Sequence, residues 1–228
     1  MIFDPTKTVI LFSHGFGVRQ DARGLFTHLS KKLSTLGYKT KLFDYNKFDE
    51  KTKELFGLPF SAQAKILQDQ IDELKRNSNY EDIVLIGHSQ GSLIPALCNN
   101  ISKVSKVIGI SPFFHTNIND IRRRYTSKPG NILNFNGVSK RKRSDGSTTI
   151  IPPEYWQERF NTDVVSLYND IAFKTKLTLI YAVDDQVMDF TDLRKILNTR
   201  IINVEGDHDL SSEYRKGLMD VIMWELDE

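Results

Sequence analysis

A serine lies at the centre of a glycine-bounded pentapeptide, Gly87-His88-Ser89-Gln90-Gly91, between an apolar run and a stretch that can form a helix. The apolar run over 83–86 has the composition of a buried strand, and residues 93–100 favour a helix. The order of these three segments predicts a strand, a tight turn and a helix, with Ser89 at the apex of the turn. Only residues without a Cβ let strand and helix approach this closely, which explains both glycines.

A serine hydroxyl on such a turn is a nucleophile only when a histidine base and an orienting carboxylate accompany it. In proteins with this kind of serine turn, the acid follows the serine along the chain, and the histidine follows the acid. The strand predicted over 176–183 leads into Asp185, and the strand predicted over 200–205 is followed closely by His208. We therefore predict a metal-free Ser89, His208, Asp185 triad.

Attack by such a serine on a carbonyl group also requires backbone N–H groups that bind the developing oxyanion. One comes from the residue after the nucleophile, which is Gln90. The other is expected from the loop after an earlier strand. The apolar run over 8–13 leads into His14-Gly15-Phe16-Gly17, and Phe16 is the predicted second donor.

These paired loop signals, with the acid and the histidine downstream, resemble the α/β-hydrolase family over nearly the whole chain. They are most similar to small carboxylesterases of the feruloyl or cinnamoyl type and to related acyl-ester hydrolases and acyl thioesterases. The resemblance implies an α/β-hydrolase fold and a serine esterase for small or medium acyl groups. An enzyme acting on acyl groups bound to acyl carrier protein and a non-catalytic binding protein on this fold are the alternatives.

The acid and the base have alternatives in the sequence. In the resembled family, the acid commonly lies in a Gly-x-x-Asp-x-x-Val pattern, in which Ala182 here replaces the glycine. Asp184 therefore stays open as the acid. Asp189 is a weaker candidate because it is well placed to cap a following helix. His115 is a distant second choice for the base.

The chain alternates predicted strands with predicted helices, which indicates a parallel sheet with helices on both faces. We expect one domain over 1–228, with a reduced, mostly parallel sheet of about six strands and a lid insertion at about 112–175. The predicted strands cover 8–13, 39–45, 82–87, 104–110, 176–183 and 200–205, and the predicted helices cover 21–36, 61–77, 91–101, 190–198 and 211–226.

The lid segment is strongly basic: residues 122–143 contain eight Lys or Arg residues and no acidic residue. One interpretation is a solvated hairpin that turns at Asp145-Gly146. The other is a docking surface for an acidic partner such as acyl carrier protein, a phospholipid surface or an acidic substrate. The candidate docking residues are Arg122, Arg123, Arg124, Lys140, Arg141, Lys142 and Arg143.

Several further residues are candidates for the wall of a substrate pocket. Phe113 and Phe114 follow a predicted strand end near the catalytic edge, and Trp156 lies in an aromatic lid segment. His14 belongs to the predicted oxyanion loop, where its imidazole is expected to hold the loop by hydrogen bonds. Trp156 could equally be an ordinary contact between lid and body.

Composition favours an ordinary folded enzyme, with 39% apolar and 26% charged residues. The single Cys98 cannot form an internal disulfide and is expected in the core. No apolar stretch is long enough to cross a bilayer, and no leader pattern opens the chain, so we expect a cytoplasmic protein. No metal-ligand spacing occurs, and neither a cofactor nor a nucleic-acid partner is expected.

Overall fold

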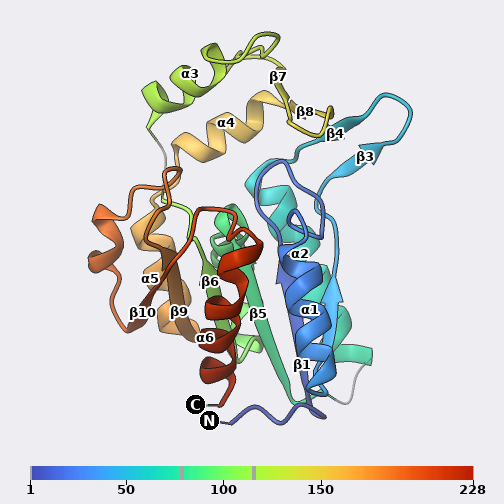
Figure 1. Cartoon of the computed structure of the whole chain (residues 1–228), viewed down its shortest axis with the longest axis vertical. Coiled ribbons are helices and arrows are strands. Elements are labelled where there is room, and N and C mark those ends of the chain that lie inside the picture. The colour runs from blue at the N-terminus through green and yellow to red at the C-terminus, as the bar shows by residue number, and fades with distance from the viewer. Residues whose placement is uncertain (1, 78–79, 115–116, 228) are drawn as a thin grey trace.

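The computed structural model describes residues 2–77, 80–114 and 117–227, and its centre is a parallel sheet (Figure 1). The strands lie in the order β10-β9-β6-β5-β1-β2, and every neighbouring pair is parallel. The sequence prediction of six strands is confirmed. Their bounds are β1 Thr8–Ser13, β2 Lys39–Leu42, β5 Asp82–His88, β6 Lys106–Ile110, β9 Lys176–Ala182 and β10 Thr199–Val204.

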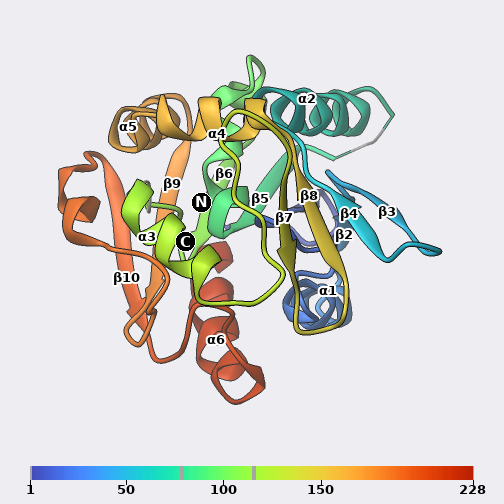
Figure 2. The same cartoon turned by 90° about the horizontal axis from the view of Figure 1, so that it is seen from above.

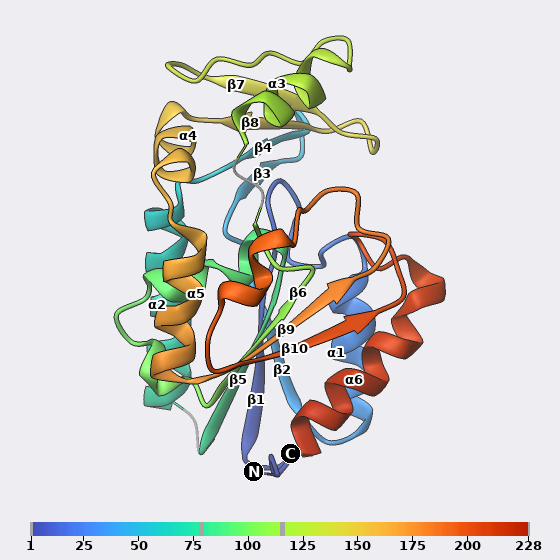
Figure 3. The ribbon, with the colours of Figure 1, turned by 90° about the vertical axis from the view of Figure 1, so that its left-hand side faces the viewer.

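Helices cover both faces of this sheet, as Figure 2 and Figure 3 show. On one face lie α2 (Phe60–Asn77) and α5 (Val164–Lys174), and on the other lie α1 (Leu25–Thr35) and α6 (Arg215–Asp227). Alternate residues of a strand point to opposite faces, so a strand buried on both faces is apolar throughout. This accounts for the unbroken apolar run in β1, which contributes side chains to both hydrophobic clusters.

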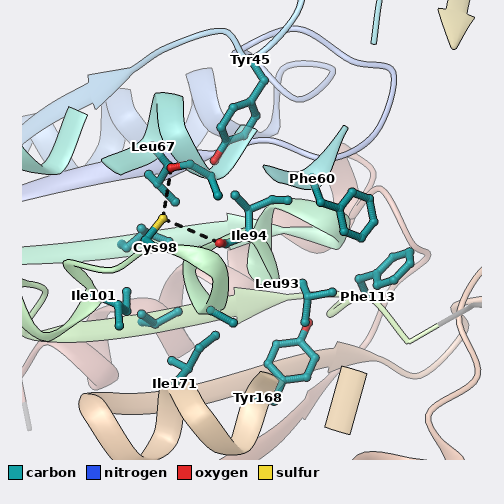
Figure 4. Packing of buried hydrophobic residues seen from close by; sticks show 14 of the residues in the cluster. Tyr45, Phe60, Leu67, Leu93, Ile94, Cys98, Ile101, Phe113, Tyr168 and Ile171 are labelled. Atoms are coloured by element: carbon teal, nitrogen blue, oxygen red, sulfur yellow. Dashed lines mark hydrogen bonds between the residues drawn. The ribbon is translucent and has the colours of Figure 1, made fainter. Parts of the chain in front are cut away.

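The cluster beneath α2 and α5 is drawn in Figure 4. Cys98 lies within it, and its Sγ contacts the carbonyl oxygen of Ala64 at 3.3 Å. Burial raises the pKa of the Cys98 thiol to about 12, so the group stays protonated and unreactive at neutral pH. Its predicted place in the core is confirmed.

Two of the predicted helices are wrong. Residues 91–101 form three short 3₁₀ turns, η1 Ser89–Ser92, η2 Ile94–Leu97 and η3 Ile101–Lys103, in place of one α-helix. Pro95 explains the break because a proline ring collides with the carbonyl four residues earlier in an α-helix. Residues 190–198 give only the 3₁₀ turn η4 (Thr191–Lys195), which ends where Ile196 becomes extended and buries its side chain.

A second, four-stranded sheet lies beyond the carboxyl ends of the central strands, in the order β3-β4-β8-β7 (Figure 1). Its strands are β3 Lys47–Asp49, β4 Glu54–Phe56, β7 Ser139–Lys142 and β8 Thr148–Ile151. With α3 (Ile118–Thr126) and α4 (Pro153–Phe160), it forms what we call the cap. The hairpin β3–β4 was not predicted, because strands of three residues are too short to show a period.

The remaining part of the predicted insertion, α5, packs against β9 and the η2 turn and so lies on the central sheet. Within the described ranges, no helix is both long enough and apolar enough to cross a membrane.

Candidate active site

Ser89 follows β5 directly and has a positive φ of 52°, a conformation that is strained for a residue with a side chain. A Cβ at Gly87 would come within 2.5 Å of the carbonyl oxygen of Gly91, and a Cβ at Gly91 would overlap the carbonyl oxygen of Ser13. The Ser13 hydroxyl donates to the Gly91 carbonyl at 2.7 Å. Both glycines are therefore required by direct backbone contact, and the turn is fastened to the end of β1.

Three side chains from three separate loops form a chain of hydrogen bonds. Nδ1 of His208 lies 2.7 Å from Oδ2 of Asp185, and Nε2 of His208 lies 3.1 Å from Oγ of Ser89. An ionised carboxylate only accepts, so Nδ1 carries the proton and Nε2 is free to accept from the Ser89 hydroxyl. This arrangement can withdraw the proton of Ser89 when the hydroxyl attacks an electrophile.

The neighbouring aspartates have different surroundings. The side chain of Asp185 is fully buried, and its Oδ1 accepts from the backbone N–H groups of Val187 and Met188 at 2.7 and 3.0 Å. Asp184 is exposed to solvent, and Asp189 accepts from Thr191 at the start of η4. Of the three aspartates, Asp185 alone is hydrogen-bonded to His208.

Two further histidines hold the loops of the site. His88 Nε2 lies 2.9 Å from the carbonyl oxygen of His208, and His14 Nε2 accepts from the backbone N–H of Tyr45 at 3.0 Å. Burial lowers the pKa of both imidazoles, and the charge of His208 lowers that of His88 further, to about 4. Both rings are therefore neutral at pH 7. His115 lies outside the described residues.

The loop over 14–17 lies against Ser89, because a Cβ at Gly15 would come within 3.1 Å of the Ser89 Cβ. Phe16 from this loop and Gln90 from the turn both line the cavity that contains Ser89. The two residues predicted to donate backbone N–H groups thus both lie at the cavity that contains Ser89.

The Gln90 side chain belongs to a buried network that sequence reasoning missed. Its amide nitrogen donates to Gln63 of α2 at 2.9 Å, and its oxygen accepts from the Tyr155 hydroxyl of α4 at 2.7 Å. Tyr155 in turn accepts from Arg159 at 3.1 Å. These bonds join the turn, the body and the cap, and no spacing in the sequence relates their members.

A cavity of about 350 Å³ opens above Ser89, between the sheet edge and the cap. Phe113 and Trp156 line it, as the sequence predicts for a pocket wall, and Met188 does so as well. Neither His14 nor Phe114 is among its lining residues. His14 is buried behind the loop, and Phe114 packs against Tyr168 and Phe190.

The basic residues of the cap divide into two groups. Arg122, Arg123, Lys140 and Lys142 are exposed on the outside of the cap. Arg124, Arg141 and Arg143 line the cavity instead, so the seven candidate docking residues do not lie on one surface. Side chains alternate between the two faces of a strand, which accounts for the different directions of neighbours in β7. Three more basic residues, which the sequence analysis did not place here, line the cavity: Arg23, Lys128 and Arg159.

His88, His208 and Asp209 are the metal-binding candidates of the described residues, with ligand atoms within 4.8 Å of one another. Both ring nitrogens of His208 already contact Ser89 and Asp185, and Asp209 pairs with Arg23. A metal ion here would have to break these contacts. The geometry therefore favours the hydrogen-bonded serine arrangement over a metal centre.

We predict that His88 makes the fold sensitive to acid. In the unfolded chain its imidazole takes a proton below about pH 6.5, whereas in the folded protein it stays neutral down to about pH 4. Stability is thus lost as pH falls through this window, by roughly 2 kcal/mol at pH 5. Urea unfolding of the wild type and His88→Gln at pH 7.5 and pH 5 measures this loss.

The loss on acidification should be smaller in His88→Gln, whose amide cannot titrate. His28→Gln is the matched control because His28 lies half-buried on α1. An equal loss in the wild type and His88→Gln would contradict a neutral His88.

No protein-family model and no curated protein sequence matches the chain, whereas many solved structures do. Est1E from Butyrivibrio proteoclasticus superposes with a TM-score of 0.69 at 15% identity, over 98% of this chain and 88% of that one. The peroxisomal alpha-beta-hydrolase Lpx1 from Saccharomyces cerevisiae superposes with a TM-score of 0.64 at 12% identity, over 97% of this chain and 76% of that one. A thioesterase domain from the curacin biosynthetic pathway superposes with a TM-score of 0.56 at 14% identity, over 97% of this chain and 93% of that one. With its parallel sheet and serine turn, the chain has the α/β-hydrolase fold.

Proposed function

We propose that this protein is a serine hydrolase that cleaves carboxylic esters of small or medium acyl groups. The observation that carries the proposal is the hydrogen-bonded chain from Asp185 through His208 to Ser89 at the floor of a cavity. The cavity volume of about 350 Å³ is within the range of small-molecule sites. The neighbours add support, because Est1E is also described with bound ferulic acid, an aromatic acid.

The first half of the reaction forms an acyl-enzyme. Ser89 Oγ attacks the ester carbonyl carbon while Nε2 of His208 takes the hydroxyl proton. Asp185, held by two backbone N–H groups, keeps the imidazole oriented and stabilises its charged form. The carbonyl electron pair moves to oxygen, where the N–H groups of Phe16 and Gln90 are the proposed donors.

Collapse of this intermediate breaks the bond to the leaving group. The imidazolium of His208 gives its proton to the departing alcohol, and the acyl group stays bound to Ser89. In the second half, His208 takes a proton from water, and the resulting hydroxide attacks the acyl carbon. Ser89 recovers its proton from His208 as the acid product leaves.

Ser89→Ala and His208→Ala should each lower turnover of p-nitrophenyl esters, tested from acetate to palmitate, by at least ~10³-fold, because the triad acts as a unit. The circular dichroism spectra and unfolding midpoints of both variants should remain close to those of the wild type. Near-normal hydrolysis by either folded variant would remove the proposal.

Asp185→Asn should lose far more activity than Asp184→Asn. The first substitution replaces the acceptor of the His208 proton by an amide that favours the wrong tautomer, at a cost of up to ~10⁴-fold in kcat. Asp184 is exposed, so its variant is the matched control one residue away. Greater loss in Asp184→Asn would move the role of the acid to that residue.

A thioesterase acting on acyl groups bound to acyl carrier protein is the second candidate. It is favoured by the exposed basic residues of the cap, Arg122, Arg123, Lys140 and Lys142, and by the likeness to a thioesterase domain. In the same assay, slow turnover of free esters and fast turnover of the carrier-bound acyl group would favour this candidate. Neutralising Arg123 and Lys142 should then remove the advantage of the carrier.

A further inference from the structure

The cavity above Ser89 has an unusual charge balance. Six basic side chains line it, and Asp209 is the single carboxylate among its described lining residues. Asp209 is already paired with Arg23. The basic lining residues are Arg23, Arg124, Lys128, Arg141, Arg143 and Arg159.

Arg143 is the most informative of these residues. Its Nε donates to the Thr149 hydroxyl at 2.9 Å, whereas its Nη2 is buried without a hydrogen-bond partner in the described part of the chain. The guanidinium lies 5.3 Å above the centre of the Phe16 ring and occupies the space that the missing side chain of Gly17 leaves. A buried cationic donor is thus held against the proposed oxyanion loop.

The neighbours of Arg143 increase the charge instead of compensating it. Arg141 lies over the Tyr125 ring at 6.0 Å, and Arg124 donates to the carbonyl of Val187 at 2.9 Å. No carboxylate of the described residues forms an ion pair with any of these three arginines. Burial, and then the charge of Arg141, lowers the pKa of Arg143 to about 9, which still leaves it protonated at pH 7.

Burying cations together without a counter-charge is unfavourable, and a bound anion removes that cost. Guanidinium groups match carboxylate and phosphate oxygens in geometry and bind them with paired hydrogen bonds. The same cavity has apolar side chains, among them Phe113 and Met188, beside Ser89. The site therefore combines an apolar passage with a cationic wall.

We propose that the substrate is an ester with a second, negatively charged group, a carboxylate or a phosphate, which Arg143 and Arg141 bind while Ser89 attacks the ester carbonyl. The inference rests on the proposed ester hydrolysis and adds a substrate class to it. The carbon chain between the two groups lies along the apolar side chains, and the charged end is held at the cap. Arg143 and Arg141 are then specificity residues that take no part in proton transfer.

The test compares two esters that differ in one charge. p-Nitrophenyl hydrogen adipate has a free carboxylate at the end of its six-carbon acyl chain, and p-nitrophenyl hexanoate has a methyl group there. We expect the wild type to prefer the adipate ester by at least ~10-fold in kcat/KM, as one charged hydrogen bond gives. In Arg143→Met the ratio should fall toward one.

The ratio of kcat/KM for the two esters is measured on the same preparation of each variant. A lower amount of folded protein therefore affects both values equally and leaves the ratio unchanged. Lys51→Met is the matched control, since Lys51 is exposed in the turn between β3 and β4 of the cap, and it should keep the wild-type ratio. If Arg143→Met does not fold, Arg141→Met gives the same readout. A preference that survives in both arginine variants would contradict their assignment.

Two other outcomes separate the two proposals. Serine-dependent hydrolysis of the hexanoate ester without preference for the adipate ester would overturn the anionic substrate and leave ester hydrolysis standing. No Ser89-dependent turnover of either ester, or of the p-nitrophenyl series, would overturn ester hydrolysis itself. Where the hexanoate ester is hydrolysed, adipate and propyl phosphate are added as inhibitors, and the stronger inhibitor identifies the preferred anion. Inhibition by neither would contradict the cationic site.

Discussion

The contact between the end of β1 and the turn after β5 is the constraint on which the site depends. The carbonyl oxygen of Ser13 occupies the place where Gly91 would have a Cβ, and the Ser13 hydroxyl bonds to the Gly91 carbonyl. This contact fixes the turn while Ser89 has a left-handed backbone, whose cost of about 1–3 kcal/mol the surrounding packing must offset. His88 extends the same framework to the His208 carbonyl. Ser89 and His208 are thus both positioned by contacts that fix the backbone around them.

The cap adds a second, chemically different surface to this framework. Its sheet combines a hairpin before α2 with a hairpin after α3, so that two distant segments of the chain close over the sheet edge. Tyr155 connects the cap to Gln90 and hence to the turn. Arg143 directly follows β7 in the cap, and its guanidinium lies over the ring of Phe16 in the loop over 14–17. The proposed substrate recognition by the cap and the proposed chemistry at Ser89 are thereby joined through direct contacts.

Much of this architecture could be predicted from the sequence because its signals are local. Apolar runs mark the strands buried on both faces, and the glycines around Ser89 mark a turn that only they can form. The helix expected after this turn is absent because Pro95 outweighs the surrounding helix propensity. The β3–β4 hairpin was missed because its strands are too short to show a period. The direction of the basic side chains could not be predicted, because it depends on which face of β7 meets the cavity.

The measurement that tests the central claim most directly is covalent labelling of the folded wild type with a fluorophosphonate, followed by intact-mass and peptide mapping. The account predicts a single adduct on Ser89, formed by attack of its oxygen on phosphorus with loss of fluoride. The adduct should be absent in Ser89→Ala and should form much more slowly in His208→Ala. An unlabelled folded protein, or an adduct on another residue, would contradict a nucleophilic Ser89.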